Sequence, residues 1–517
     1  MKKIYILMMC LVVAFMCTSI FSTYAYGERK QDPSGTTTGN ASEIVSAKPG
    51  EPTIMDLANQ IGHNKVAINI VWTLITGFLV FFMQAGFAMV ETGLTRAKNA
   101  SHTMAMNLFV YGLGVFGFWV CGFAIMFGGV GPLGTLGGYD GLNQELSVHL
   151  FGHAFGLIGT KGFFLSGVYD VGVFTLFLFQ VVFMDTAATI PTGAMSERWK
   201  FLSFTIYGVL VGAVIYPLFG NWVWGGGWLA QLGSNFHLGH GHVDFAGSSV
   251  VHMTGGVIAL VGAWILGPRI GKYNKDKSPN AIPGHNIPMA VIGAIILAFG
   301  WFGFNPGSTL AGTDLRISVV AVNTLIASIT GAIAATLWMW IFRSKKPDPT
   351  MMVNGLLAGL VAITAPCAFV NVQCAALIGV VAGFLAVEGA FFVERKLRVD
   401  DPVGAVAVHG INGAWGCLAL GLFADGTYGD GWNGVAGTVK GLFFGDASQF
   451  TAEVIGVTTN FIVIGAISYI IFKLIGIGVG NRVSAKTEMD GLDVPEMGVE
   501  GYAGIKMDKA SETPLSR

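Results

Sequence analysis

Eleven long apolar stretches run through the chain after residue 65, and they restrict the folds that are open to it. A helix that crosses a bilayer needs about 20 mostly apolar residues, and in lipid only helices and closed barrels satisfy every backbone polar group. Only 11% of the 517 residues are charged. The sequence therefore predicts an all-α polytopic membrane protein. The expected spans are residues 66–90, 107–128, 171–196, 201–220, 248–267, 287–305, 317–342, 353–368, 374–394, 404–424 and 452–474.

The N-terminus has the pattern of a secretory signal peptide. Lys2 and Lys3 precede an apolar run, and the small residues of 23–25 offer a cleavage site. An uncleaved first helix is the alternative, but a polar segment follows at once. We therefore expect a signal peptide at 1–25, a flexible external segment at 26–65, a transmembrane domain at 66–475 and a cytoplasmic tail at 476–517.

The basic residues of the loops indicate the orientation. A cleaved signal places the mature N-terminus outside, and the loops that are then inside carry fourteen Lys and Arg against three outside. This asymmetry agrees with the positive-inside rule, and eleven spans put the C-terminus inside. The inner residues are Arg96, Lys98, Arg198, Lys200, Arg269, Lys272, Lys275, Lys277, Arg343, Lys345, Lys346, Arg395, Lys396 and Arg398, and the outer ones are Lys161, Arg316 and Lys440.

One motif occurs twice. "DFAGSSVVHMTGG" (244–256) and "DPVGAVAVHGING" (401–413) share the pattern D-x-x-G-x-x-x-V-H-x-x-x-G. They begin the fifth and tenth expected spans, which run in opposite directions. The sequence therefore predicts an inverted five-plus-five repeat, and such repeats place a central site near the bilayer midplane.

Each copy of the motif carries a histidine eight residues after its aspartate, namely His252 and His409. Eight helical residues rise about 12 Å, so both rings are expected inside the hydrocarbon. Ionisable groups there usually face a cavity or the protein interior. Two equivalent histidines fit either a polar, proton-handling pore or bis-histidine haem ligation. Haem proteins of this kind usually have several pairs, so we favour the pore and expect no cofactor.

The two aspartates have a structural interpretation. Asp244 and Asp401 stand where their helices are expected to begin, and Pro402 would occupy the first helical position. Asp as N-cap with Pro at N1 is an ordinary helix start. We expect capping for both, and a direct role in conduction is the alternative.

Aromatic residues gather at the expected outer ends of three spans. The ordinary interpretation is an interfacial aromatic belt, which suits Trp222 and Trp228. A subset that converges on one vestibule would form a cation–π site with a hydroxyl acceptor. Its candidates are Phe179, Phe183, Trp224, Trp301, Phe304 and Ser308.

Weaker signals lie in the external loops. His237, His240 and His242, and separately His149 with His153, could bind a transition metal, but solvated surface is the more ordinary interpretation and we predict no metal site. Cys367 and Cys374 flank a short turn and could pair, although four scattered cysteines make no disulfide framework. The chain has no P-loop, catalytic triad or HExxH motif, so we do not expect an enzyme.

Seven stretches together resemble the ammonium transporter (Amt/Mep/Rh) family, bacterial Amt type, across all eleven expected spans. They are "FFMQAGFAMVETGLTRAKNA" (81–100), "FQVVFMDTAATIPTGAMSER" (179–198), "WVWGGGWL" (222–229), "DFAGSSVVHMTGG" (244–256), "GWFGFNPGS" (300–308), "RVDDPVGAVAVHGINGAWG" (398–416) and "DGLDVPEMG" (490–498).

The resemblance implies a role for each candidate residue. His252 and His409 would be twin pore histidines, and Phe183 with Phe304 would form a stacked gate. Trp224, Ser308 and Phe183 would frame an outer ammonium-recruitment site near Asp244, with Phe179 and Trp301 in the vestibule. It also implies a homotrimer with one pore per subunit in the bacterial inner membrane, and binding of PII-type regulators at the cytoplasmic face. An ammonium sensor of the same fold is the alternative.

The sequence departs from the family pattern at three positions. Asp185 stands soon after the gate phenylalanine, where the family pattern has a small neutral residue. Met497 and Val499 stand in the tail where many members have His and Glu. The tail differences weaken the expectation of PII control more than the expectation of transport.

Overall fold

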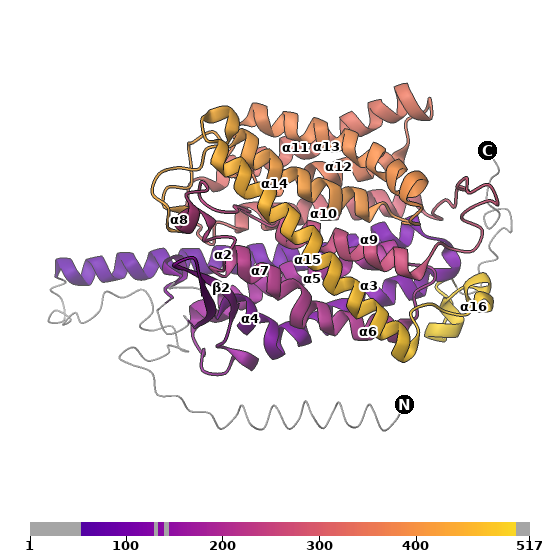
Figure 1. Ribbon diagram of the computed structural model, residues 1–517, viewed down its shortest axis with the longest axis horizontal. Helices are drawn as coiled ribbons and strands as arrows, with labels where there is room; N and C mark the ends of the chain where they lie inside the picture. Colours follow the sequence, from indigo (N-terminus) through magenta and orange to yellow (C-terminus); the bar gives the residue numbers. More distant parts are fainter. Residues whose placement is uncertain (1–52, 129–132, 139–143, 503–517) are drawn as a thin grey trace.

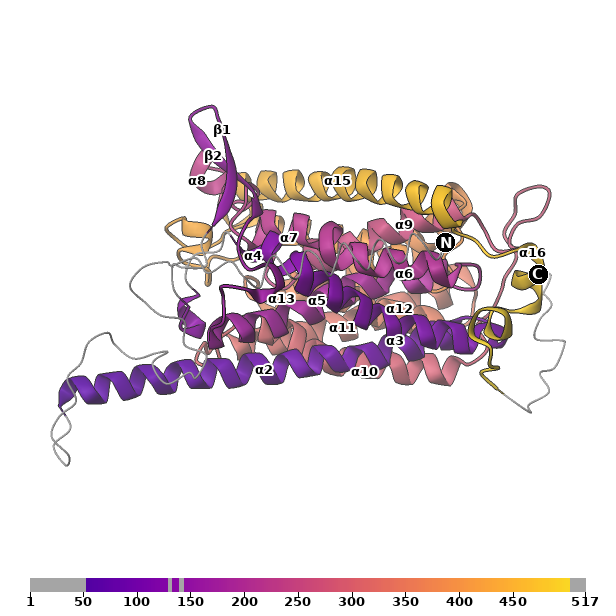
Figure 2. The same cartoon turned by 90° about the horizontal axis from the view of Figure 1, so that it is seen from below.

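The computed structural model describes residues 53–128, 133–138 and 144–502, and the signal-peptide prediction lies outside them. Ten helical segments of this part are long and apolar enough to cross a membrane. An eleventh apolar helix, α12 (Pro349–Thr364), has 16 residues. The helices lie side by side along one direction (Figures 1 and 2). The prediction of an all-α, multi-pass architecture is confirmed.

The helices of the first half lie at the expected spans, although α2 and α3 begin earlier than expected. Some contain a short π-helical turn, denoted η, within the helix or at one of its ends. The elements are α2 (Ile54–Leu94), α3 (Ala100–Gly117) continued by η2 (Phe118–Gly122) and α4 (Phe123–Phe127), α5 (Val171–Met195), α6 (Phe201–Leu210) continued by η6 (Val211–Ile215) and α7 (Tyr216–Trp224), and η7 (Ser248–Met253) continued by α9 (Thr254–Leu266).

The second half repeats this arrangement after the loop that follows α9. Its elements are α10 (Ile287–Gly307), α11 (Ile317–Trp338) with η8 (Met339–Arg343), α12, α13 (Val372–Phe392) with η9 (Val393–Leu397), η10 (Val406–Ile411) with α14 (Asn412–Phe423), and α15 (Ala447–Val479).

The first helix begins earlier than its apolar pattern suggested. We expected residues 54–65 to belong to the flexible external segment, but α2 starts at Ile54. Thr53 and Asp56 form a capping box, in which the Thr53 hydroxyl accepts from the Asp56 N–H and the Asp56 carboxylate accepts from the Thr53 N–H. Capping satisfies the first helical donors, so the helix extends past the apolar stretch.

The two ends of the bundle carry different additions. At one end, β1 (Glu145–Leu150) and β2 (His153–Gly159) pair antiparallel through a turn at Phe151 and Gly152, near the short helix α8 (Leu232–Phe236) (Figure 2). At the other end lies α16 (Ala485–Asp490) (Figure 1). Under the predicted orientation the hairpin end is outside and the α16 end is inside.

Small residues let the helices approach closely, as is usual where lipid supplies no hydrophobic driving force. A Cβ on Gly359 of α12 would lie 2.2 Å from the Ala327 carbonyl oxygen of α11. A Cβ on Gly256 of α9 would lie 2.2 Å from the Gly410 nitrogen. The second approach joins the two repeat copies, so the abundance of glycine in the chain has a packing reason.

Both motif copies fold alike, although their helix starts differ from the prediction. The Asp401 carboxylate accepts from the backbone N–H groups of Val403, Gly404 and Val406, so it does cap the chain. Pro402, however, is not the first helical residue. Gly404 has φ +79° and its counterpart Gly247 has φ +117°. Such values favour glycine, and the backbone therefore turns before each helix begins.

A buried ion cluster joins the loops at the α16 end. Arg269 donates to Asp400 through Nε (2.9 Å) and Nη2 (3.0 Å), and to Glu197 through Nη1 (2.8 Å). Arg96 also pairs with Glu197, and Arg198 donates to the Asp400 carbonyl oxygen. Burial alone would raise the pKa of Glu197 and of Asp400, but the neighbouring guanidinium groups outweigh it and lower both pKa values. Both acids are therefore ionised at neutral pH.

This cluster predicts a pH-dependent contribution to stability. Replacing Asp400 with Asn leaves Arg269 with one carboxylate partner, and breaking a buried pair costs about 3–5 kcal/mol. In detergent at pH 7 we expect D400N to melt several degrees below wild type. Because the folded pKa of Asp400 is lowered, the difference should persist above about pH 5 and shrink as the pH falls below about 4.

The matched control for this prediction is D276N, which changes an exposed aspartate of a surface loop. It should melt like wild type throughout. Equal melting of D400N and wild type at pH 7 would show that the cluster contributes nothing to stability.

Candidate functional site

The two motif histidines meet at the centre of the bundle. The Nδ1 atoms of His252 and His409 lie 3.3 Å apart, and the rings are 5.3 Å apart with an interplanar angle of 28°. His252 is fully buried and His409 is 5% exposed. The repeat thus brings together two residues that are far apart in the sequence.

Two aromatic rings lie against His252. Its ring stacks on Trp301 at 5.1 Å and on Phe304 at 5.3 Å. The Trp301 Nε1–H donates to the Thr364 hydroxyl at 3.0 Å, which fixes the indole. Thr364 was not among the predicted site residues, because nothing in its surrounding sequence marks it.

The row of aromatic rings continues toward the hairpin end. Phe304 of α10 and Phe183 of α5 stack with centroids 4.0 Å apart and an angle of 28°. Phe179 lies 4.6 Å from Phe183, and Trp224 meets Phe183 edge-on at 6.1 Å. The structure therefore brings these rings together in the order Trp224, Phe183, Phe304 and His252, with the last three buried inside the protein and Trp224 partly exposed at the end of the row.

Trp224 and Ser308 are the partly exposed members of this group. The Ser308 hydroxyl donates to the Phe304 carbonyl oxygen at 2.8 Å. Its oxygen can also accept a hydrogen bond, because a hydroxyl is both donor and acceptor. A hydroxyl and an indole at the open end, with buried rings behind them, are suited to holding a small cation.

Asp244 organises the backbone beside Trp224. Its carboxylate accepts from the N–H groups of Gly247, Ser248, Ser249 and Val250 and from the Ser249 hydroxyl, at 2.7–3.0 Å. Its carbonyl oxygen accepts from Trp224 Nε1 at 2.6 Å. Asp244 is 1% exposed, and these bonds agree with its predicted capping role.

A small cavity of about 20 Å³ lies on the far side of His409, which is room for about one water. Phe87 and Glu91 of α2 line it together with His409, and the Phe87 ring lies 6.1 Å from the His409 ring. Glu91 accepts from Asn107 (2.7 Å) and from Thr192 (2.7 Å). Sequence reasoning missed Glu91, yet a lone carboxyl near the end of a long apolar segment is a signal of function.

The histidine pair has no room for haem. In bis-histidine ligation the iron and the macrocycle lie between the two rings, and even the Zn–N bond to histidine is about 2.0 Å long. The two nitrogens are 3.3 Å apart, and Trp301 and Phe304 already lie against His252. The residues present therefore do not fit the haem alternative.

One other sequence expectation, the solvated state of the loop histidines, differs from the structure. His240 and His242 are buried, at 5% and 0% exposure, rather than solvated, and only His237 of that group is exposed. Cys367 and Cys374 are free and form no disulfide with each other. Asp185 is buried on α5, and its Oδ1 has no hydrogen-bond partner among the described residues.

Comparison with known proteins agrees with this architecture. The model of the Ammonium Transporter Family matches residues 71–502. Ammonium transporter Amt2 of Archaeoglobus fulgidus is 44% identical over 455 residues, which are 87% of this chain and 92% of the relative. Ammonium transporter Amt1 of Haloferax mediterranei is 36% identical over 457 residues, which are 86% of this chain and 81% of that relative.

Solved structures of the same kind superimpose on the chain. A protein described as "Sensor Amt Protein" matches with a TM-score of 0.72 at 34% identity, over 84% of this chain and 99% of that chain. Candida albicans Mep2 matches with a TM-score of 0.68 at 25% identity, over 87% and 93%. The fold and its central site define a multi-pass helical membrane transporter. The chain belongs to the ammonium transporter family.

The close approach of the two repeat copies gives a prediction. In G256A the new Cβ would lie 2.2–2.4 Å from backbone atoms of Gly410, next to His409, so η10 must move. Such overpacking costs roughly 1–3 kcal/mol. We expect a lower melting temperature and ammonium-dependent activity reduced about tenfold, which corresponds to about 1.4 kcal/mol.

G465A is the matched control, because its Cβ would meet only Val257 at an ordinary 3.7 Å. It should behave like wild type. A G256A variant with wild-type melting and activity would mean that the approach at Gly256 does not set the spacing of the histidines.

Proposed function

We propose that this protein transports ammonium by binding NH₄⁺ at the outer aromatic site and conducting NH₃ past the twin histidines. The observation that carries the proposal is the unbroken row of contacts from Trp224 through Phe183 and Phe304 to His252 and His409. The family match and the names of the curated relatives support the same substrate.

We assign the binding of NH₄⁺ to the partly exposed end of this row, at Trp224 and Ser308. The faces of Trp224 and Phe183 attract a cation through their ring quadrupoles, and the Ser308 hydroxyl accepts an N–H bond. The Asp244 carbonyl fixes the Trp224 indole through the 2.6 Å bond. The Asp244 carboxylate, held by four backbone N–H groups, acts on this site through its charge and through the backbone that it orders.

The buried phenylalanine pair makes deprotonation the less costly route. A bare ion in an apolar medium costs tens of kcal/mol by Born solvation. Removing a proton from an amine with a pKa about 3 above the ambient pH costs roughly 4 kcal/mol, at 1.36 kcal/mol per pKa unit. Phe183 and Phe304, in contact at 4.0 Å, therefore favour passage of the neutral molecule.

The histidines supply the polar groups on the path. One neutral imidazole can donate Nδ1–H to the other Nδ1, at the observed 3.3 Å. His252 Nε2 has no hydrogen-bond partner among the described residues, so it is available to ammonia or to a proton. The pair can thus pass a proton separately from NH₃.

The first prediction of this proposal concerns substrate. In proteoliposomes that contain the full chain, ammonium should give a transient inward current and potassium should give none. Methylammonium, as a slightly larger amine, should give a smaller current. The alternative function is an ammonium sensor, and a protein that binds ammonium without any current or uptake would favour it.

The second prediction concerns the proton. Replacing His252 and His409 together with Ile or Leu removes both ring nitrogens and keeps the side chains apolar and buried. The double variant should lose net charge movement while it still elutes and melts as a folded protein. A full ammonium current in that variant would exclude the histidines as proton carriers.

Assembly and regulation are part of the same proposal. A homotrimer and binding of a PII-type regulator at the predicted cytoplasmic face rest on the family resemblance. The docked tail supports a regulatory role for that face, since Lys98 donates to the carbonyl oxygens of Glu488 and Met489 and the Asp493 carboxylate accepts from the His102 N–H. Native mass spectrometry would give the oligomeric state and any PII binding.

A further inference from the structure

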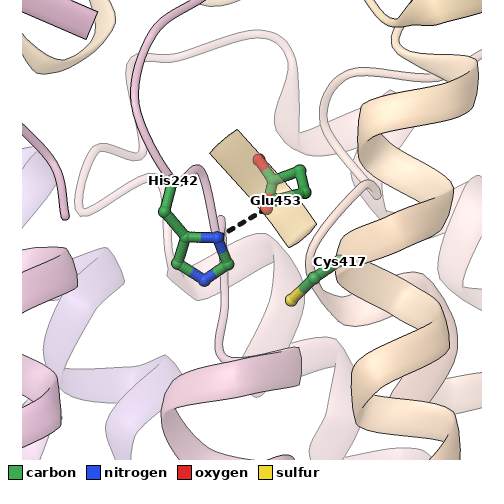
Figure 3. A group of neighbouring side chains, drawn as sticks. All are labelled: His242, Cys417 and Glu453. Carbon is green, nitrogen blue, oxygen red and sulfur yellow. Dashed lines mark ion pairs between the residues drawn. The ribbon is translucent and has the colours of Figure 1, made fainter. Parts of the chain in front are cut away.

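A second cluster of titratable side chains lies buried behind Asp244, away from the row of aromatic rings. His242 of the loop before η7, Cys417 of α14 and Glu453 of α15 point toward one another (Figure 3). All three are fully buried, and their ligand atoms lie within 4.8 Å of one another. The proposed transport path uses none of them.

The hydrogen bonds around His242 determine where its protons are. The Ser249 hydroxyl donates to Asp244 Oδ2 at 2.7 Å, so its proton is committed to the carboxylate. His242 Nε2 lies 2.9 Å from the same hydroxyl oxygen and must therefore be the donor in that contact. The neutral ring then presents the lone pair of Nδ1 to the cluster.

Hydrogen bonds from outside the cluster also hold the Glu453 carboxylate in place. Its Oε1 accepts from the Val243 N–H at 2.9 Å and from Gln449 Nε2 at 2.8 Å. Its Oε2 faces His242 Nδ1 at 2.6 Å. Every other polar atom of these two side chains is satisfied from outside the cluster.

The contact between Nδ1 and Oε2 requires a cation. The two atoms are fully buried and 2.6 Å apart, and neither has another hydrogen-bond partner among the described residues. Two lone pairs at that distance repel each other unless a positive charge lies between them. The candidates are a proton and a metal ion, and the Cys417 sulfur is close enough to be a third ligand for a metal.

The packing makes room for the ring at this position. A Cβ on Gly456 of α15 would lie 2.2 Å from His242 Nδ1, so any other residue there would displace the imidazole. Gly456, one helical turn after Glu453, therefore leaves space for the His242 ring because it has no side chain.

We propose that His242 Nδ1, Glu453 Oε2 and Cys417 Sγ form a binding site for a borderline-soft divalent cation of the Zn²⁺ class. A mixed nitrogen, oxygen and sulfur set is typical of zinc, and tetrahedral coordination separates its nitrogen and oxygen ligands by about 3.4 Å. Nδ1 and Oε2 therefore move apart by about 0.8 Å when the metal binds.

The charges balance in the bound state. A dication with one thiolate, one carboxylate and a neutral imidazole has no net charge, which suits a fully buried site, and a water would take the fourth tetrahedral position. The outer contacts also fit, because metal-ligating histidines donate their second ring N–H to an oriented acceptor. Here that acceptor is Ser249, which is itself fixed by Asp244.

In the metal-free protein a proton occupies the same place. It lies between His242 Nδ1 and Glu453 Oε2, which are 2.6 Å apart. Zn²⁺ would displace this proton together with the proton of the Cys417 thiol.

The test uses the full chain purified in detergent, stripped with a chelator, equilibrated with Zn²⁺ or Co²⁺ alone, and desalted. We expect about one zinc per chain by elemental analysis and a near-ultraviolet thiolate-to-cobalt charge-transfer band. H242Q, C417S and E453Q should each weaken binding by about 10-fold or more. Metal content is measured without ammonium, so this result is separate from the transport proposal.

H237Q and C374S are matched controls, since they change a histidine of the same loop and a cysteine outside the cluster, and both should bind like wild type. Elution volume and melting in chelator identify any variant that fails to fold, and E453Q preserves the side-chain shape. A stripped wild type that takes up no zinc, or a folded C417S and E453Q that bind like wild type, would overturn the proposal and leave a proton as the occupant.

Discussion

This structure depends on one constraint, which is the free-energy cost of burying a polar group without a hydrogen-bond partner. Several buried polar atoms of the described residues have no hydrogen-bond partner, and two groups of them belong to clusters of titratable side chains. His252 Nε2 lies on the row of aromatic rings, and His242 Nδ1 and Glu453 Oε2 face each other in the second cluster. Burial makes both clusters chemically significant, because an unsatisfied nitrogen or oxygen costs more free energy there than at the surface.

Backbone contact between the two repeat copies places the histidines. Gly256 lies against Gly410, so the two motif helices cross without side chains between them. The His252 and His409 rings on these helices therefore face each other through their Nδ1 atoms. The helix starts contribute too, since Asp244 and Asp401 each gather backbone N–H groups and Gly247 and Gly404 supply the turn. Rigid helix ends hold the rings more closely than loops would.

Sequence reasoning found the parts of this site that follow from local pattern. The spans follow from hydropathy, and His252 and His409 follow from the repeated motif. It missed one local signal, the capping box at Thr53, which extended α2 beyond its apolar stretch. Elsewhere it failed where tertiary contacts decide. His242 stands in a polar loop beside exposed His237, and its burial depends on Glu453, more than two hundred residues later. Glu91 and Thr364 were missed because their partners come from other helices.

The sequence by itself determined the class of protein, its helices and the pairing of two histidines, because hydropathy and an inverted motif are properties of the chain alone. Only the tertiary structure decided which aromatic rings stack, which helix starts turn on glycine, and which side chains share the cluster of His242, Cys417 and Glu453. The physical reason is that these features depend on distances between segments far apart in the sequence, and close packing in the folded chain sets those distances.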